Sequence, residues 1–143
     1  MKNHQFMGMA LGVAVMFSAG GALAEGNPEN GQAVAERRCG SCHTFEQGDR
    51  NKVGPNLFGV IGRAAGTVEG FNYSDLSAAA TDAGLVWTEE LVVEYLPNAQ
   101  DFLEDYVARN GGTPTGRTRM TFRLRDEQDR RDVAAYLATL RAE

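Results

Sequence analysis

Few side chains that bind zinc or form disulfides occur in this sequence. Its 143 residues include two cysteines, Cys39 and Cys42, and two histidines, His4 and His43. A disulfide between Cys39 and Cys42 would be strained and would close almost no loop. A zinc site of four Cys and His ligands would need His4, which lies in a segment that we expect to be removed. These absences exclude a Cys/His zinc fold and a disulfide-stabilised fold.

The apolar run at the amino end is too short for a membrane span. It extends from Phe6 to Phe17, follows Lys2 and is interrupted by glycine, whereas a spanning helix needs about 20 apolar residues. Ala22-Leu23-Ala24 follows as an A-x-A cleavage pattern. We predict that residues 1–24 are a secretory signal peptide cleaved before Glu25. A retained membrane anchor is the alternative hypothesis.

The remaining residues, 25–143, predict one all-α domain in the periplasm. Cleavage would leave 119 of the 143 residues, and the loss of Lys2 would change the formal net charge from −5 to −6. This acidic balance argues against a nucleic acid as partner. The sequence shows no strand-like alternation of useful length, so a sheet is not expected. It also shows no internal repeat.

One short motif, Cys39-Gly40-Ser41-Cys42-His43, dominates the interpretation. C-x-x-C-H is the attachment sequence of c-type haem. Each thiol can add across one vinyl group of a porphyrin, and the thioether bonds then leave His43 under the iron as proximal ligand. A dithiol redox centre uses the same C-x-x-C spacing, but it requires a βαβ context that this sequence does not show. We therefore predict one covalent haem c.

Capping residues and apolar spacing predict five helices. Asn27-Pro28-Glu29 gives the first helix an N-cap, a proline at the first helical position and an acidic first turn. Gly31 lies on the inner side of that helix, where glycine costs nearly 1 kcal/mol relative to alanine, so we expect it to permit close packing. Thr44 to Gly70 predicts a long loop that a bound haem would organise. The helices should span residues 28–39, 75–82, 89–96, 98–109 and about 127–140.

Candidates for the second axial ligand are few. Within residues 25–143, His43 is the one histidine and Met120 the one methionine, which excludes two histidine ligands from a single chain. A lone methionine is usually core filler, but Met120 lies in the irregular polar segment from Thr118 to Phe122. We predict that Met120 binds the iron. A thioether favours ferrous iron and fills the position where oxygen, peroxide or a substrate would bind.

Together these residues resemble a class I c-type cytochrome, most closely the soluble bacterial cytochrome c-two group. The resemblance covers most of residues 25–143 and implies a single-domain class I cytochrome c fold with helices wrapped around one haem. Beyond the haem motif it rests on Gly31, Val53-Gly54-Pro55-Asn56-Leu57, Gly62-Arg63, Gly66, Gly70-Phe71-Asn72-Tyr73-Ser74-Asp75, Trp87, Glu94-Tyr95-Leu96, Thr118 to Phe122 and Ala135-Tyr136-Leu137.

The resemblance implies roles on the histidine and propionate sides of the haem. The Pro55 carbonyl would accept the Nδ1 proton of His43 and orient the imidazole. Tyr73 and Trp87 would hydrogen-bond a haem propionate, with Arg63 nearby offsetting its charge. A core position for Trp87 and a solvated charge for Arg63 are the alternative interpretations.

On the methionine side, the resemblance implies that Tyr95 and Thr118 contact the haem and that Phe122 covers its edge. Tyr95 could also be a core aromatic. Two departures from the family pattern matter. Ala35 stands where the family commonly has an aromatic, which predicts a looser contact between the first and last helices unless Val34 compensates. The stretch from Tyr95 to Met120 is longer than in the shortest members and resembles that of longer ones.

Charge is unevenly distributed along the chain. Asp82 to Asp105 includes seven acids and no Lys or Arg, whereas residues 106–125 hold five arginines and no acid. Solvated faces usually account for such runs, but the basic segments should border the exposed haem edge. We hypothesise that a basic front docks onto acidic surfaces of membrane redox complexes and speeds encounter. This front comprises Arg37, Arg38, Arg50, Lys52, Arg109, Arg117, Arg119, Arg123 and Arg125.

We predict a monomeric periplasmic one-electron carrier, not an enzyme, with no small-molecule substrate. By resemblance it would pass electrons from a cytochrome bc1-type donor to an oxidase or a photosynthetic reaction centre. One alternative is a haem subunit of a larger dehydrogenase or oxidase. Another is a haem peroxidase or ligand sensor in which Met120 does not bind iron. That alternative needs a distal base, usually histidine, and residues 25–143 contain no spare histidine.

Overall fold

The computed structural model describes residues 25–142, so the predicted signal peptide at residues 1–24 lies outside the described residues. The described chain forms five helices, and the all-α prediction is confirmed. The helices lie close to the predicted ranges. They are α1 (Pro28–Arg38), α2 (Asp75–Asp82), α3 (Glu89–Tyr95), α4 (Ala99–Arg109) and α5 (Glu127–Thr139).

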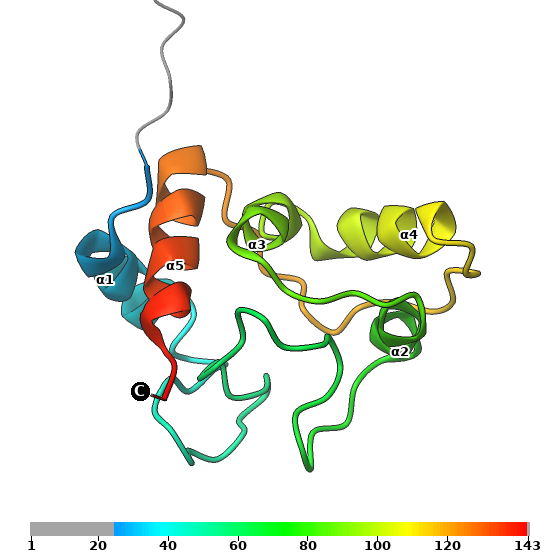
Figure 1. Ribbon diagram of the computed structural model, residues 1–143, viewed down its shortest axis with the longest axis horizontal. Helices are drawn as coiled ribbons and strands as arrows, with labels where there is room; N and C mark the ends of the chain where they lie inside the picture. The colour runs from blue at the N-terminus through cyan, green and yellow to red at the C-terminus, as the bar shows by residue number, and fades with distance from the viewer. Residues whose placement is uncertain (1–24, 143) are drawn as a thin grey trace, which may run out of the picture.

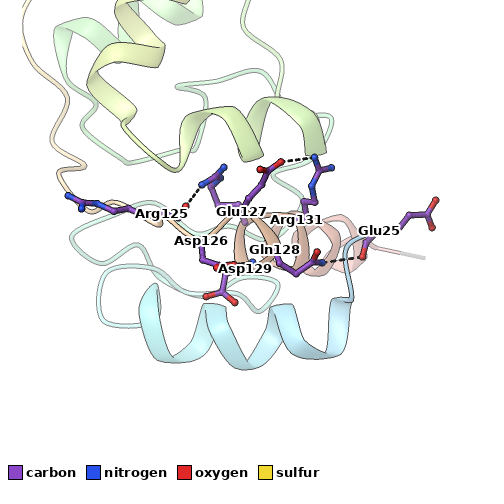
Figure 2. A network of polar contacts seen from close by, with 8 residues as sticks. Glu25, Arg125, Asp126, Glu127, Gln128, Asp129 and Arg131 are labelled. Carbon is purple, nitrogen blue, oxygen red and sulfur yellow. Dashed lines mark hydrogen bonds and ion pairs between the residues drawn. The ribbon is translucent and has the colours of Figure 1, made fainter. Parts of the chain in front are cut away.

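Each helix begins where a side chain caps it. In every case the capping oxygen accepts a backbone N–H of the first turn, which supplies a partner that the helix itself cannot provide. The caps are Asn27, which the sequence predicted, and Ser74, Thr88, Asn98 and Asp126. At the start of α5, Arg131 also pairs with Glu127 at 2.9 Å, one turn earlier (Figure 2).

The first and last helices pack against each other at one end of the molecule, α2 and α4 lie at the other end, and α3 lies between them and packs against both α5 and α4 (Figure 1). Gly31 permits the close approach of α1 to α5, because a Cβ there would lie 1.9 Å from the Asp132 carbonyl oxygen. This agrees with the prediction that Gly31 serves close packing.

The expected weakness at Ala35 does not occur. Val34 and Ala35 are both buried in the core shared by α1 and α5, at 2% and 0% exposure. An aromatic side chain is supplied from elsewhere, since the Phe45 ring lies 5.9 Å from that of Tyr136 on α5. Phe45 follows shortly after the haem motif, so the segment after the motif fills space beside α5.

A second core lies between α2 and α4. Leu76, Leu85 and Val107 are fully buried there. Phe102 is also buried, and its ring stacks with Trp87 and meets Tyr95 edge to face. Residues 62–65 run antiparallel to residues 85–87, with a single isolated bridge between Ala64 and Val86. The long loop from Thr44 to Gly70 lies below α1 and α5 and extends towards α2 in the view of Figure 1. No helix within residues 25–142 is long and apolar enough to cross a membrane.

Candidate functional site

A cavity of about 370 Å³ lies between the two cores and is lined mainly by apolar side chains. Pockets for small molecules and cofactors are usually of this size and character. Every site residue predicted from sequence lines the cavity: Cys39, Cys42, His43, Pro55, Arg63, Tyr73, Trp87, Tyr95, Thr118, Met120 and Phe122. Elements far apart in the sequence thus bring these residues together.

The haem motif begins at the C-cap of α1. The backbone turns tightly there, since the N–H groups of Cys42 and His43 both donate to the Cys39 carbonyl, at 3.0 and 2.9 Å. Both cysteines are free thiols, with Cys39 buried and Cys42 exposed. Burial raises the pKa of the Cys39 thiol to about 11, although the neighbouring Arg38 opposes the shift.

His43 is fixed in one tautomer. Its Nδ1 lies 2.7 Å from the Pro55 carbonyl oxygen, and because a carbonyl can only accept, Nδ1 carries the proton and donates. Burial lowers the pKa of His43, so the ring is neutral near pH 7 and Nε2 keeps its lone pair. Gly54 packs against the ring, since a Cβ there would lie 2.4 Å from His43 Cε1.

The segment that carries Met120 has no regular structure. The Tyr95 hydroxyl donates to Met120 Sδ at 3.2 Å, and the Met120 N–H donates to Thr118 Oγ1 at 3.2 Å. Burial raises the pKa of Tyr95 to about 12, so the hydroxyl remains a donor throughout the physiological range. Tyr95 and Thr118 therefore contact the thioether segment directly.

Arg63 and Tyr73 are already hydrogen-bonded to the backbone. The Arg63 guanidinium donates to the carbonyls of Phe58 at 2.9 Å and Asn56 at 3.1 Å. The Tyr73 hydroxyl accepts the Val68 N–H at 3.2 Å. These contacts hold the loop after the haem motif and place a cation on the cavity wall.

Trp87 and Phe122 line the cavity and make different aromatic contacts. The Trp87 ring lies 4.9 Å from that of Tyr95 in an edge contact, which belongs to the aromatic cluster of the second core. Phe122 contacts the exposed Arg38, whose guanidinium carbon is 5.4 Å from its ring centre. This distance is within the range of a cation–π contact. It joins the end of α1 to the Met120 segment.

The sequence interpretation gave no role to two polar side chains that support the site. Asn56, 9% exposed, donates to Thr44 Oγ1 and the Glu46 carbonyl, both at 2.9 Å, and so holds the loop that carries Pro55. Gln100 on α4 accepts the Thr118 N–H at 2.9 Å. The position of Asn56 directly after Pro55 gave a weak indication of the first, but nothing in the sequence pattern indicates the second.

The residues around the cavity fit a covalently attached haem. The wall presents two free thiols, a neutral imidazole with an available Nε2 and a thioether, which are the groups that bind this cofactor in proteins. Within residues 25–142, no group of three or more His, Cys, Asp or Glu side chains could hold a bare metal ion instead. The site therefore combines attachment groups and axial donors in one apolar cavity.

Comparisons with known proteins agree with this chemistry. The sequence matches the cytochrome c family over residues 28–141. It is 52% identical over 107 residues to a cytochrome c2 of Rhodopseudomonas palustris, covering 73% of this chain and 91% of the relative. It is 38% identical to cytochrome c2 of Rhodospirillum rubrum, covering 95% and 97%. The structure of cytochrome c2 from Rhodospirillum centenum aligns with a TM-score of 0.78 at 45% identity, covering 82% and 100%.

Proposed function

This chain belongs to the cytochrome c family, and we propose that it shuttles single electrons between membrane redox complexes in the periplasm. It is an electron carrier rather than an enzyme and carries one covalent haem c, as the sequence predicted. Haem iron cycles between ferric and ferrous states and so takes up and releases one electron at a time. The observation that carries the proposal is the convergence of Cys39, Cys42, His43 and Met120 on one apolar cavity.

In this proposal each residue has a defined task. Cys39 and Cys42 hold the haem through thioether bonds. His43 binds the iron through Nε2, because the Pro55 carbonyl takes the Nδ1 proton and fixes the ring. Met120 binds the iron from its own segment, where the Tyr95 hydroxyl contacts the sulfur. If His43 and Met120 both held the iron, the protein would leave no open coordination position for a substrate.

The remaining predicted residues would lie around the propionates and the edge of the haem. Tyr73 and Trp87 would contact a propionate, and Arg63 would offset its negative charge while holding the loop carbonyls. Phe122 would cover the haem edge, in contact with Arg38. An electron leaving through this edge would cross a surface bordered by arginine side chains.

The experiment that tests the axial assignment is Met120→Ala in the haem-loaded protein. We expect the methionine-to-iron absorption band of the ferric protein to disappear, cyanide or carbon monoxide to bind readily, and the potential to fall. Thr121→Ala is the matched control, because Thr121 is an exposed neighbour whose side chain makes no hydrogen bond in the described residues. Unchanged ligand binding in Met120→Ala would exclude Met120 as a ligand and favour a different sixth group.

Covalent attachment and export are tested by the intact mass. We expect the purified protein to weigh one haem more than the polypeptide that begins at Glu25. Replacement of both Cys39 and Cys42 by Ala should leave haem that acid and organic solvent extract. A mass that includes residues 1–24 would instead indicate a retained amino-terminal segment and argue for a membrane-tethered subunit.

The basic front defined above supports the proposal that the redox partners present acidic docking surfaces. All nine of its side chains are exposed. Two of them, Arg38 and Arg119, line the cavity, as does Val53, which is 78% exposed. The seven acids between Asp82 and Asp105 are also exposed, so the charges are segregated along the chain. We expect association with a membrane redox complex to slow as salt rises, because screening weakens such fields. A rate independent of salt would contradict this docking mode.

A further inference from the structure

The first turn of α4 contacts the segment that carries Met120. Gln100 Oε1 accepts the Thr118 N–H at 2.9 Å, and Gln100 Nε2 donates to the Gly116 carbonyl at 3.4 Å and to Glu104 one turn later. A backbone N–H can only donate and a carbonyl can only accept, so these partners determine which end of the amide faces which group. The Gln100 side chain is therefore oriented by both the segment and its own helix.

The contacts continue from Thr118 to the thioether. Thr118 Oγ1 accepts the Met120 N–H at 3.2 Å, and Met120 Sδ accepts the Tyr95 hydroxyl at 3.2 Å. Gln100 and Tyr95 thus hold Met120 from opposite ends of one short series of hydrogen bonds. Tyr95 lies on α3 and Gln100 on α4, in the stretch that the sequence interpretation marked as longer than in the shortest relatives.

This support matters because the segment has little else to hold its backbone. Within residues 25–142, no backbone-to-backbone hydrogen bond outside the helices involves residues 113–123. Backbone-to-backbone hydrogen bonding begins again at Leu124, whose N–H donates to the Leu96 carbonyl at 2.9 Å. Residues 113–123 are held instead by side-chain contacts, such as the hydrogen bond from Arg119 to the Asn72 carbonyl. The Gln100 contact is the one that fixes the Thr118 N–H directly.

We propose that Gln100 is a positioning residue for Met120, which keeps the thioether at the iron by holding Thr118. The inference rests on the proposed function, because it assigns Gln100 to a ligand that Met120 supplies. A glutamine that merely stabilised α4 would affect global unfolding. A positioning residue affects how readily an added ligand displaces Met120 while the remainder of the protein stays folded.

The test compares Gln100→Leu with the wild-type haem-loaded protein. Leucine has a similar volume and a good helix propensity but no hydrogen-bonding group. We expect imidazole to displace the methionine about fivefold more tightly and Thr118 amide hydrogen exchange to quicken by a similar factor. A factor of five corresponds to one net hydrogen bond of about 1 kcal/mol. The combined change Gln100→Glu and Glu104→Gln keeps an acceptor for the Thr118 N–H and reverses the contact between positions 100 and 104, but it loses the donor to the Gly116 carbonyl. It should therefore bring both values back most of the way to wild type.

The matched control is Gln128→Leu on α5. Gln128 is half-buried and donates to the Glu25 carbonyl at 3.3 Å (Figure 2) and to Asp132 Oδ1 at 2.9 Å. Neither hydrogen bond involves the Met120 segment. It should lower the free energy of unfolding without changing imidazole affinity. Wild-type imidazole affinity and Thr118 exchange in Gln100→Leu, or an equal rise in affinity in Gln128→Leu, would overturn the inference. A wild-type protein without the methionine-to-iron band would instead overturn the proposed ligation itself.

Discussion

The two parts of the chain that supply the axial ligands are held in different ways. The haem motif follows α1, which packs on α5 through backbone contact at Gly31 and a continuous buried core. Met120 lies in a segment held by individual side-chain hydrogen bonds, among them those of Tyr95 and Gln100. Backbone packing cannot loosen locally without disturbing the core, whereas single hydrogen bonds of about 1 kcal/mol each can open one at a time.

This difference predicts two kinds of mutational effect. Changes at the α1–α5 contact should alter the free energy of global unfolding. Changes around Met120 should alter ligand exchange and potential with little effect on unfolding. Substitutions at Gly31, Asp132, Tyr95 and Arg38 test this separation.

The largest effect is expected for Gly31→Ala. The new Cβ would lie 1.9 Å from the Asp132 carbonyl oxygen, so α1 and α5 would have to separate. We expect the free energy of unfolding to fall by about 3 kcal/mol or more, as overpacking against backbone does. Chemical denaturation of the haem-loaded protein measures it. Gln32→Ala, on the exposed side of the same helix, should change stability by less than about 0.5 kcal/mol. Similar values for both variants would show that the contact adapts.

The next effect concerns Asp132, a buried carboxylate that joins α5 to the start of α1. It accepts the Asn27 N–H at 2.7 Å, the Gln128 amide at 2.9 Å and the Asn30 amide. We expect Asp132→Ala to cost about 2 kcal/mol, because buried donors would lose their acceptor. Asp129→Ala, on the same helix, should cost much less.

Asp132 also predicts a dependence on pH. Burial alone would raise its pKa, but the three donors outweigh burial and lower it below the ordinary value of 3.8. Because the folded pKa is the lower one, this stabilisation is complete above the unfolded value and is lost as the pH falls through the folded value. The free energy of unfolding should therefore depend less on pH in the acid range in Asp132→Asn than in wild type. Parallel curves would show that Asp132 keeps its ordinary pKa.

A smaller effect is expected for Tyr95→Phe, which removes the hydroxyl from Met120 Sδ. Without this donor the sulfur gives more electron density to the iron, which stabilises the ferric state relative to the ferrous state. The reduction potential should therefore fall by about 20–40 mV. That range corresponds to roughly 0.5–1 kcal/mol for one electron. Voltammetry measures it. Tyr106→Phe, which changes a stacked tyrosine on α4, should leave the potential unchanged.

The smallest effect is expected for Arg38→Gln. It removes the guanidinium from the Phe122 ring, a contact worth about 0.5 kcal/mol at an exposed site. Imidazole should then displace the methionine about twofold more tightly. Arg37→Gln removes the same charge from the preceding, equally exposed position and should change the affinity less. Equal effects would assign the change to charge rather than to contact with Phe122.

Local chemistry made much of the fold predictable from the sequence. The five capping side chains determined where the helices begin, because a helix start needs acceptors that only a few residue types supply. The spacing of the haem motif and the scarcity of His and Met were enough to reduce the ligand candidates to His43 and Met120. Gly31 was identified because glycine is unfavourable in a helix unless close packing requires it.

The parts that escaped prediction depend on long-range contact. Phe45 fills space beside Tyr136, although the family pattern pointed to position 35, and no periodicity in the loop indicates this. The antiparallel pairing at Ala64 and Val86 is a single bridge, too short for an alternating pattern. Gln100 lies on an amphipathic helix where a polar residue is ordinary, so only its contact with Thr118 reveals a role.

The burial of Cys39 sets an order of assembly. In the folded chain the Cys39 side chain is 8% exposed, whereas Cys42 is exposed. A covered thiol is less accessible to a reactant than an exposed one. We therefore expect the porphyrin to be joined to Cys39 before the fold has closed around the cavity.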